Sequence, residues 1–279
     1  MKTPLYIRTY KLRRNNILLS KNPRLVVTDR PVYFIVWKDD YTASDYDKLH
    51  LPSNYSFIFQ TTDRKYSPQE TNYQFNQAMK DKDEFIYLMD DDIEAGHIYC
   101  KSGRNLQDIL NELDTDLEKI KDDYLATVNL NWRDCEGTTR NIARAFYILN
   151  FKQLADRGIF FDRNTNVAED VDISLQYFRV TGKLPILFRD KHMHFRMNDK
   201  SLAPPEYKEN SYKIIYDRYK DLPISFTLFM DNKEGNWVLK PNSKLYKSAP
   251  YFDDIEKAKE YVKTKPDKFG IQKAHVNFS

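Results

Sequence analysis

FIYLMDDDI, residues 85–93, runs from five apolar residues straight into three aspartates. A short apolar run of β-forming residues that stops at a charge cluster predicts a buried strand ending at Met89 or Asp90. Such strands usually belong to parallel sheets covered on both faces, and ligands of open α/β sheets bind just outside the carboxyl ends of the strands. We therefore expect Asp90, Asp91 and Asp92 to lie at a ligand-binding edge.

Three adjacent carboxylates repel one another unless a positive charge lies among them. Mg²⁺ and Mn²⁺ take oxygen ligands and keep substrate phosphates as partners. Residues two apart on an extended segment point the same way, so Asp90 and Asp92 are predicted to face one ion while Asp91 faces elsewhere. The alternative is a solvated acidic turn, because short acidic runs are common on surfaces.

The chain has 279 residues, 41% of them hydrophobic, which suffices for one large α/β domain with a small appendage or for two modest domains. Only 7 glycines are present, and neither a dinucleotide fingerprint nor a P-loop occurs, which argues against glycine-rich phosphate loops. The formal net charge of +3 neither demands nor excludes a nucleic-acid partner.

Segments outside the catalytic motifs indicate a cytoplasmic protein. The two cysteines, Cys100 and Cys135, lack the spacing of a zinc or redox site, so we expect free thiols in a reducing compartment. No signal-peptide core is apparent at the amino terminus, and no run of about 18 apolar residues predicts a membrane span.

Strand and helix patterns alternate up to Asp92. Strands are predicted at residues 5–10, 31–37 and 55–59, with helices at 41–49 and 68–80. This alternation predicts a parallel, Rossmann-like sheet with right-handed crossovers. Further along, the pattern predicts helices at 106–122, 151–157 and 167–178, strands at 124–130, 145–150 and 183–188, and a polar loop at 131–140.

Polar residues follow several of these elements. Arg8 and Thr9 end the first strand and precede a basic loop; they offer donors to a diphosphate or nucleobase, or simply form a surface turn. Glu169 and Asp170 begin a helix, where acidic residues are ordinary partners of the helix dipole but where one can also serve as a general base. A histidine pair, residues 192 and 194, follows the last core strand and suits either a metal site or the surface.

The pattern changes after Pro204. A helix is predicted at 206–220, strands at 224–230 and 237–239, and a helix at 253–263. Lysines interleave with aromatic residues between 207 and 273, a mixture that either contacts nucleic acid through phosphates and stacked bases or forms a plain solvated appendage. We predict a catalytic domain at 1–200 and an appendage at 201–279.

The ordered set of motifs over residues 5–198 resembles the GT-A glycosyltransferases. Their metal-binding DxD motif matches Asp90 to Asp92 after an apolar strand, their acidic pair at a helix start matches Glu169 and Asp170, and their late histidine matches His192 or His194. The resemblance implies a GT-A-like α/β fold: a Rossmann-type mixed sheet flanked by helices, with a small α+β appendage at the carboxyl terminus.

Two strings are similar to the TET-associated glycosyltransferase group. They are LMDDDI at residues 88–93 and EDVDISLQ at 169–176. That group occurs largely in bacteriophages and is thought to glycosylate hydroxymethylated pyrimidines in DNA. The resemblance therefore implies a UDP-sugar or other nucleotide-sugar donor, 5-hydroxymethylcytosine in phage DNA as the acceptor, and the host cytoplasm as the location.

The resemblance also implies roles for the metal and donor residues. Asp92, with Asp90, binds Mn²⁺ or Mg²⁺, which neutralises the charge that develops on the leaving nucleoside diphosphate. His194, or alternatively His192, completes the metal shell.

On the donor side, Arg8, Thr9 and Tyr10 hold the nucleobase or ribose, with Asp91 beside the donor.

The acceptor side follows in the same way. Asp170, with Glu169 as the alternate, deprotonates the acceptor hydroxyl. Trp132, Arg133 and Arg140 frame the acceptor, and a base within duplex DNA has to be flipped out of the stack. Both inverting and retaining outcomes stay open.

Other functions fit parts of the pattern. A GT-A enzyme of this size can act on a glycan, a lipid or a protein, and the aspartate triplet also suits a metal-dependent nuclease. A non-catalytic structural protein is the third alternative, and it would tolerate Asp92→Asn without biochemical loss.

Overall fold

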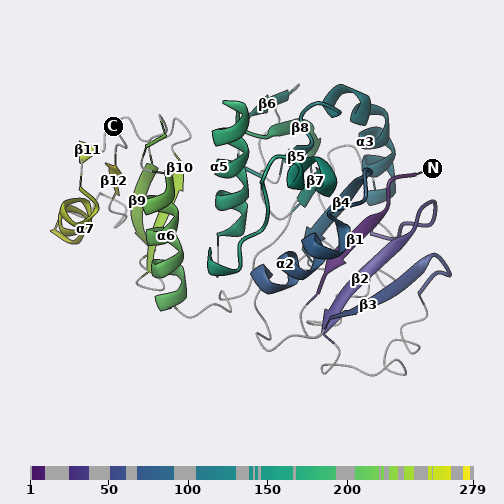
Figure 1. Cartoon of the computed structure of the whole chain (residues 1–279), viewed down its shortest axis with the longest axis horizontal. Helices are drawn as coiled ribbons and strands as arrows, with labels where there is room; N and C mark the ends of the chain where they lie inside the picture. The colour runs from purple at the N-terminus through teal and green to yellow at the C-terminus, as the bar shows by residue number, and fades with distance from the viewer. Residues whose placement is uncertain are drawn as a thin grey trace.

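The structure is a computed structural model of the chain. It describes residues 2–9, 25–37, 51–60, 68–90, 105–129, 138–140, 142–143, 146–165, 168–192, 205–219, 221–222, 226–231, 236–241, 251–252, 254–264 and 273–276. Figure 1 shows a large sheet with flanking helices and, beside it, a smaller group of strands and helices that contains the carboxyl terminus.

The central sheet has eight described strands in the order β3-β2-β1-β4-β7-β5-β8-β6. Their bounds are β1 Leu5–Arg8, β2 Val32–Trp37, β3 Tyr55–Gln60, β4 Phe85–Asp90, β5 Leu125–Asn129, β6 Thr138–Arg140, β7 Phe146–Asn150 and β8 Ile186–His192. Strands β1 to β4, β5 and β8 run parallel, whereas β7 and β6 run against them. The predicted Rossmann-type mixed α/β sheet is therefore confirmed.

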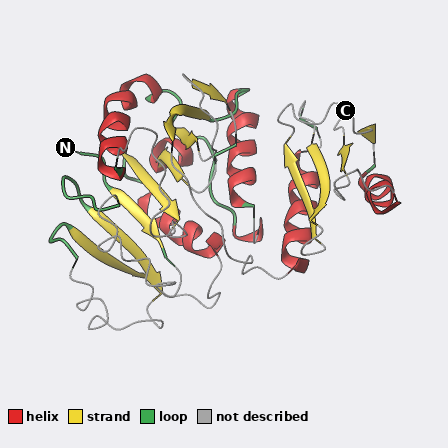
Figure 2. Ribbon diagram, turned by 180° about the vertical axis from the view of Figure 1, so that it is seen from behind, coloured by secondary structure: helices red, strands yellow, loops and turns green. Residues whose placement is uncertain are grey.

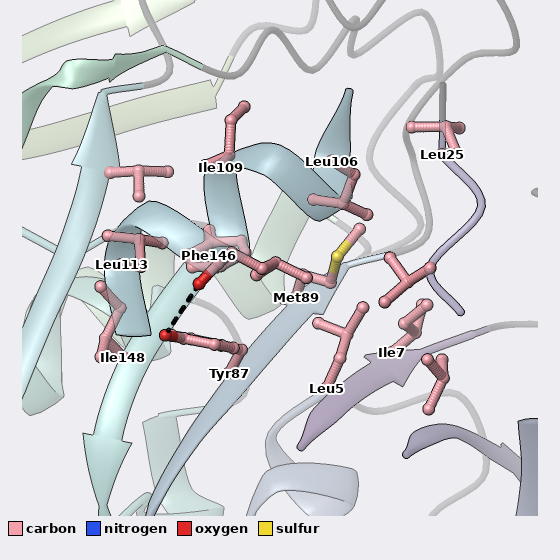
Figure 3. Packing of buried hydrophobic residues seen from close by; sticks show 14 of the residues in the cluster. Leu5, Ile7, Leu25, Tyr87, Met89, Leu106, Ile109, Leu113, Phe146 and Ile148 are labelled. Atoms are coloured by element: carbon pink, nitrogen blue, oxygen red, sulfur yellow. Dashed lines mark hydrogen bonds between the residues drawn. The ribbon is translucent and has the colours of Figure 1, made fainter. Parts of the chain in front are cut away.

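Helices cover both faces of this sheet. Helix α3 (Leu106–Ile120) packs on one face, and α2 (Pro68–Met79), α4 (Phe151–Ala155) and α5 (Glu169–Thr181) pack on the other. Because side chains alternate along a strand, Tyr87 and Met89 of β4 face α3, whereas Ile86 and Leu88 face the opposite layer. Figure 3 shows the α3 layer, in which the Tyr87 hydroxyl donates a hydrogen bond to the backbone oxygen of Leu110 (3.5 Å).

Local sequence explains where these helices begin and end. Asn105 accepts the Asp108 N–H while the Asp108 side chain accepts the Asn105 N–H, a capping box that starts α3. Pro68 occupies the first turn of α2, where its missing N–H costs nothing. Gly182 adopts φ +70° just after α5, and Gly158 adopts φ +71° shortly after α4, conformations that favour glycine at helix ends.

The carboxyl-terminal part contributes a second sheet and two helices. The sheet has the order β10-β9-β12-β11, from β9 (Phe226–Asp231), β10 (Asn236–Pro241), β11 (Tyr251–Phe252) and β12 (Lys273–Val276). Helix α6 (Pro205–Tyr219) lies next to α5 in both views, and α7 (Ile255–Thr264) lies on the far side of the small sheet (Figures 1 and 2). An apolar cluster combines Val171 and Leu175 of α5 with Ile215 of α6 and Ala258 of α7.

Some sequence-based bounds differ from the structure. The segment 131–140, expected to be a loop, contains strand β6, whose three residues pair with β8. Strand β8 continues past its expected end at residue 188 to His192, where it pairs with Asn129 after a register shift. Strands β11 and β12 were not expected, because they are short and gain their hydrogen bonds only from sheet neighbours. The helix expected at 41–49 lies outside the described residues, and the domain division at residue 200 stays a prediction.

No helix in the described part of the chain combines the length and the apolar composition needed to cross a bilayer.

A polar network joins α5 to α6. The side chain of Asp172 on α5 is only 1% exposed and accepts hydrogen bonds from the Tyr219 hydroxyl (2.7 Å) and from Gln176 Nε2 (2.8 Å). Arg218 lies 3.4 Å from the same carboxylate and also pairs with Asp162. Helix α6 is thus attached by its last turn to the helix that begins with Glu169 and Asp170.

The burial of Asp172 predicts a pH-dependent stability. Burial raises the pKa of Asp172 above its usual 3.8, against the opposing effect of Tyr219. The folded protein then keeps a proton that the unfolded chain releases, so the contribution of Asp172 to stability falls as the pH rises through this interval. We expect Asp172→Asn to gain stability relative to the unmodified chain between about pH 4 and pH 7, measured by urea unfolding.

Asp254→Asn provides a control of opposite sign. Asp254 accepts the backbone N–H groups of Lys257 and Glu256, which lower its pKa. Its contribution to stability is present above the unfolded pKa and is lost as the pH falls, so this variant should lose stability relative to the unmodified chain as the pH rises. Parallel pH profiles for Asp172→Asn and the unmodified chain would contradict the role of burial.

Candidate functional site

The site is centred on Arg8, the last residue of β1. Tyr6 faces the α2–α5 layer, so strand alternation turns Arg8 to the same side. Its guanidinium donates to Asn72 Oδ1 on α2 (2.6 Å), and its side chain is 7% exposed. A buried guanidinium requires counter-ions, and two carboxylates supply them.

The first counter-ion is Asp90, the last residue of β4. In the parallel β1–β4 ladder Asp90 is the direct partner of Arg8, so both side chains leave the carboxyl ends of adjacent strands on the same face. Arg8 Nη2 and Asp90 Oδ1 form a close ion pair. Asp90 is 32% exposed, so part of its side chain reaches the surface.

The second counter-ion is Glu169, the first residue of α5. Glu169 Oε1 lies 3.5 Å from Arg8 Nη1 and is 16% exposed. Its position depends on Ala168, which precedes the helix in the left-handed conformation (φ +66°, ψ +33°) and provides no side-chain cap. This conformation is costly for a residue other than glycine, and such strain is concentrated at functional sites.

Asp170 lies beside Glu169 and belongs to the helix start itself. Its Oδ1 accepts the N–H of Val171 (2.8 Å), and its backbone oxygen accepts the hydroxyl of Ser174 (2.7 Å). The same hydroxyl accepts the N–H of Ala143 (3.0 Å), which ties the first turn of α5 to the segment before β7. Asp170 is partly exposed, as a residue that meets an acceptor has to be.

Electrostatics hold Arg8 and its neighbour Tyr147 in defined charge states. Burial opposes the charge on Arg8, but Asp90, Tyr147 and Glu169 outweigh it and raise the pKa of Arg8 above its ordinary value. The Arg8 guanidinium lies over the ring of Tyr147 on β7, 5.4 Å from the centroid. Burial, together with Glu169, raises the pKa of Tyr147 well above 10, so its hydroxyl stays protonated at neutral pH.

The structure thus brings together four of the residues that the sequence singled out: Arg8, Asp90, Glu169 and Asp170. They come from β1, β4 and α5, and they meet at the carboxyl edge of the parallel strands. Their catalytic and binding roles stay predictions.

Thr9 is buried and continues the β1–β2 ladder through its N–H to Ile35 O (3.1 Å). By alternation its side chain faces the α3 layer, away from Arg8. A contact of Thr9 with the same ligand atoms as Arg8 is therefore not favoured.

Arg140 and His192 are described only by their backbones, in β6 and β8. Strand β8 is three strands from β4, or about 14 Å at the usual strand spacing, and β6 is one strand further. His192 is therefore a poor partner of Asp90 on one ion. The remaining candidates lie outside the described residues: Tyr10, Asp91, Asp92, Trp132, Arg133 and His194.

Asp90 could serve as one ligand of a divalent cation. Its carboxylate is 32% exposed at a strand end and offers the hard oxygen that Mg²⁺ and Mn²⁺ take. Within the described ranges, no group of three His, Cys, Asp or Glu side chains could hold a metal ion. Further ligands would have to come from Asp92 or His194.

Two residues of the site, Asn72 and Tyr147, were missed at the sequence level. Asn72 lies in the same buried stripe of α2 as Phe75 and Met79, and Asn76 follows one turn later. Two asparagines four apart on an apolar stripe are a signal, since buried amides need partners. Tyr147 gave no signal, because an aromatic residue in a strand is ordinary core.

Comparisons with known proteins give weak likenesses. No protein-family model and no curated protein matches the chain. Among solved structures, 4-diphosphocytidyl-2C-methyl-D-erythritol synthase from Anaerococcus prevotii has a TM-score of 0.40 at 10% identity, covering 77% of this chain and 96% of that one. The apo form of the glycosyltransferase GlyE from Streptococcus pneumoniae has a TM-score of 0.40 at 11% identity, covering 78% and 63%. Function is therefore inferred from this chain's own residues.

The charge network makes Arg8 a stability determinant. Arg8→Met leaves Asp90 and Glu169 without their shared cation, and we expect the free energy of unfolding to fall by about 3 kcal/mol in urea denaturation. Adding Glu169→Gln to Arg8→Met should recover part of that loss, because one uncompensated charge is removed.

Lys152→Met is the matched control, since its ion pair with Asp156 is exposed. It should change stability far less than Arg8→Met does, because solvent screens an exposed ion pair. An equal, small effect of Arg8→Met and Lys152→Met would show that Arg8 is not the buried link.

Proposed function

We propose that this chain is a metal-dependent glycosyltransferase that moves a sugar from a nucleotide-sugar, a UDP-sugar, to an acceptor hydroxyl. One observation supports this most: Arg8 joins a strand-end carboxylate, Asp90, to Glu169 at a helix start, and Asp170 is the next residue of that helix. A donor side and an acceptor side of one reaction centre are expected to be this close.

The chemistry divides between the two sides. Asp170 takes the proton of the acceptor hydroxyl, whose oxygen then bonds to the anomeric carbon as the bond from that carbon to the diphosphate oxygen breaks. The electron pair leaves with the nucleoside diphosphate. Glu169 serves as a counter-ion of Arg8, which leaves Asp170 as the base, with Glu169 as the alternate.

The donor side is assigned to the strand ends. Asp90 and Asp92 would hold Mn²⁺ or Mg²⁺, with His194 as a further ligand in preference to His192, whose strand lies three strands from β4; the cation would supply charge neutralisation on the leaving diphosphate. Arg8 and Tyr10 would hold the donor, with Tyr10 at the nucleoside part, and Asp91 would lie beside it. Thr9, whose side chain faces the α3 layer, would not share the ligand atoms of Arg8.

The proposed acceptor is 5-hydroxymethylcytosine in bacteriophage DNA, modified in the host cytoplasm. Support comes from the strings shared with the TET-associated group and from the lysine and aromatic residues between 207 and 273. Trp132, Arg133 and Arg140 would contact the flipped base and its neighbours. The attachment of α6 to α5 through Asp172 would link this region to the helix that carries the proposed general base, Asp170.

Nucleotide release tests the proposal. We expect UDP release from at least one UDP-sugar that requires Mn²⁺ and rises when DNA carrying 5-hydroxymethylcytosine is added. Asp170→Asn should lower the DNA-dependent rate by about 10²–10⁴-fold, because it removes the general base. Asp92→Asn should abolish the Mn²⁺-dependent release, because it removes a metal ligand. Asp156→Asn changes an exposed carboxylate that pairs with a lysine, and it serves as the matched control.

Other outcomes separate the alternatives. Release that DNA does not change moves the acceptor to a glycan, lipid or protein. Absence of release from every donor, with DNA nicked instead, contradicts the transferase and favours a metal-dependent nuclease. Unchanged biochemistry in Asp92→Asn points to a structural protein.

A further inference from the structure

Several polar atoms on the α2–α5 face of the central sheet are buried without a hydrogen-bond partner among the described residues. Apart from Arg8 Nη2, which pairs with Asp90, four of them lie on Arg8 or on the neighbouring elements α2 and β7. They are Arg8 Nε, Asn72 Nδ2, Asn76 Oδ1 and the hydroxyl of Tyr147. Each of these residues is at least nine-tenths buried: Arg8 is 6% exposed, Asn76 3%, and Asn72 and Tyr147 are fully covered.

These residues form one cluster, here called the Arg8 cluster. Asn72 Oδ1 accepts a hydrogen bond from the Arg8 guanidinium (2.6 Å), so the amide nitrogen of the same side chain lies near Arg8. Tyr147 carries the same guanidinium over its ring at 5.4 Å. Asn76 stands one helical turn from Asn72 on the buried side of α2. Asn72 and Tyr147 therefore contact the guanidinium that pairs with the two carboxylates, and Asn76 extends the cluster along α2.

A buried polar atom without a partner destabilises a fold, and native proteins rarely keep several in one place. The positions of Arg8, Asn72 and Tyr147 set the geometry of the site. Packing alone does not explain why these residues bury hydrogen-bond donors that have no partner. A ligand that supplies the missing partners does account for them, and Asp90, at 32% exposure, is the member of the ion-pair network nearest to the surface.

The chemistry of the cluster selects the kind of ligand. Arg8 contributes one positive charge against one negative charge each from Asp90 and Glu169, so the formal charge is −1. A phosphate group is repelled by such a surface. Neutral hydroxyl groups are favoured, because each both donates and accepts and the cluster offers amide, guanidinium, phenol and carboxylate partners.

We propose that Asn72 and Tyr147, together with Arg8, bind hydroxyl groups of the sugar that is transferred and so determine which sugar is accepted. This inference rests on the proposed function. Contact with Tyr147 requires Asp90, the more exposed partner of Arg8, to turn outward, while Glu169 stays as the counter-ion of Arg8.

Tyr147→Phe and Tyr124→Phe form a matched pair of test variants. Both hydroxyls are buried and unpartnered, but Tyr124 packs under Arg157 and against Tyr177, in contacts separate from the Arg8 cluster. Without ligand, each variant should raise Tm by about 2–4 °C, because an unpaired polar atom is removed from the interior. Differential scanning calorimetry measures this effect whether or not the protein is a transferase.

Binding distinguishes the two variants. In titration calorimetry with Mn²⁺, the unmodified protein should bind at least one of UDP-glucose, UDP-galactose or UDP-N-acetylglucosamine more tightly than UDP. Tyr147→Phe should lose about 3–10-fold of that added affinity and keep its affinity for UDP, since one neutral hydrogen bond to the sugar is removed. Tyr124→Phe should keep both affinities, and Asn72→Ser should weaken the sugar increment again.

Several results would overturn the inference. A lower Tm for Tyr147→Phe would show that its hydroxyl has a partner in the free protein. UDP binding with no added affinity for any sugar, or an increment that Tyr147→Phe leaves intact, would remove the sugar subsite while leaving nucleotide release to support the proposed function. Absence of binding by UDP and every UDP-sugar, with no release, would reject the proposed function and the subsite together.

Discussion

The buried guanidinium of Arg8 constrains the part of the chain that forms the central sheet. A charge that is 7% exposed is stable only with counter-ions at hand, and these come from β4 through Asp90 and from α5 through Glu169. Asn72 of α2 fixes the plane of the guanidinium. Two strands and two helices therefore have to keep their relative positions, and the acidic edge of the sheet exists only while they do.

Helix α5 connects this centre to the rest of the chain. On the sheet side, the Tyr177 hydroxyl bonds to Asp123 (2.9 Å), and on the other side Asp172 receives Tyr219 of α6. The helix starts at the strained Ala168 and ends at Gly182, so both ends are fixed by backbone conformation. The contact with the carboxyl-terminal part and the acidic pair Glu169 and Asp170 therefore lie on one helix.

Much of the candidate site could be predicted from the sequence, because its parts are marked by local patterns. An apolar run that ends in carboxylates located Asp90 at a strand end, and the helix period located Glu169 in a first turn. The partners of Arg8 could not be assigned in this way. Tyr147 carries no local mark, and the asparagine spacing on α2 marks Asn72 as a buried amide without naming its partner; the importance of both follows from their contacts with Arg8.

The sequence by itself determined the longer helices and strands and their order, since strand and helix periods are properties of neighbouring residues, whereas the short strands β6, β11 and β12 depend on their sheet neighbours. It also determined that carboxylates end β4 and begin α5. Only the tertiary structure decided that β7 enters the sheet antiparallel between β4 and β5, which places Tyr147 beside Arg8 and moves β8 three strands from β4. Strand pairing depends on contacts between distant segments, and a buried charge finds its counter-ions only once those segments have packed together.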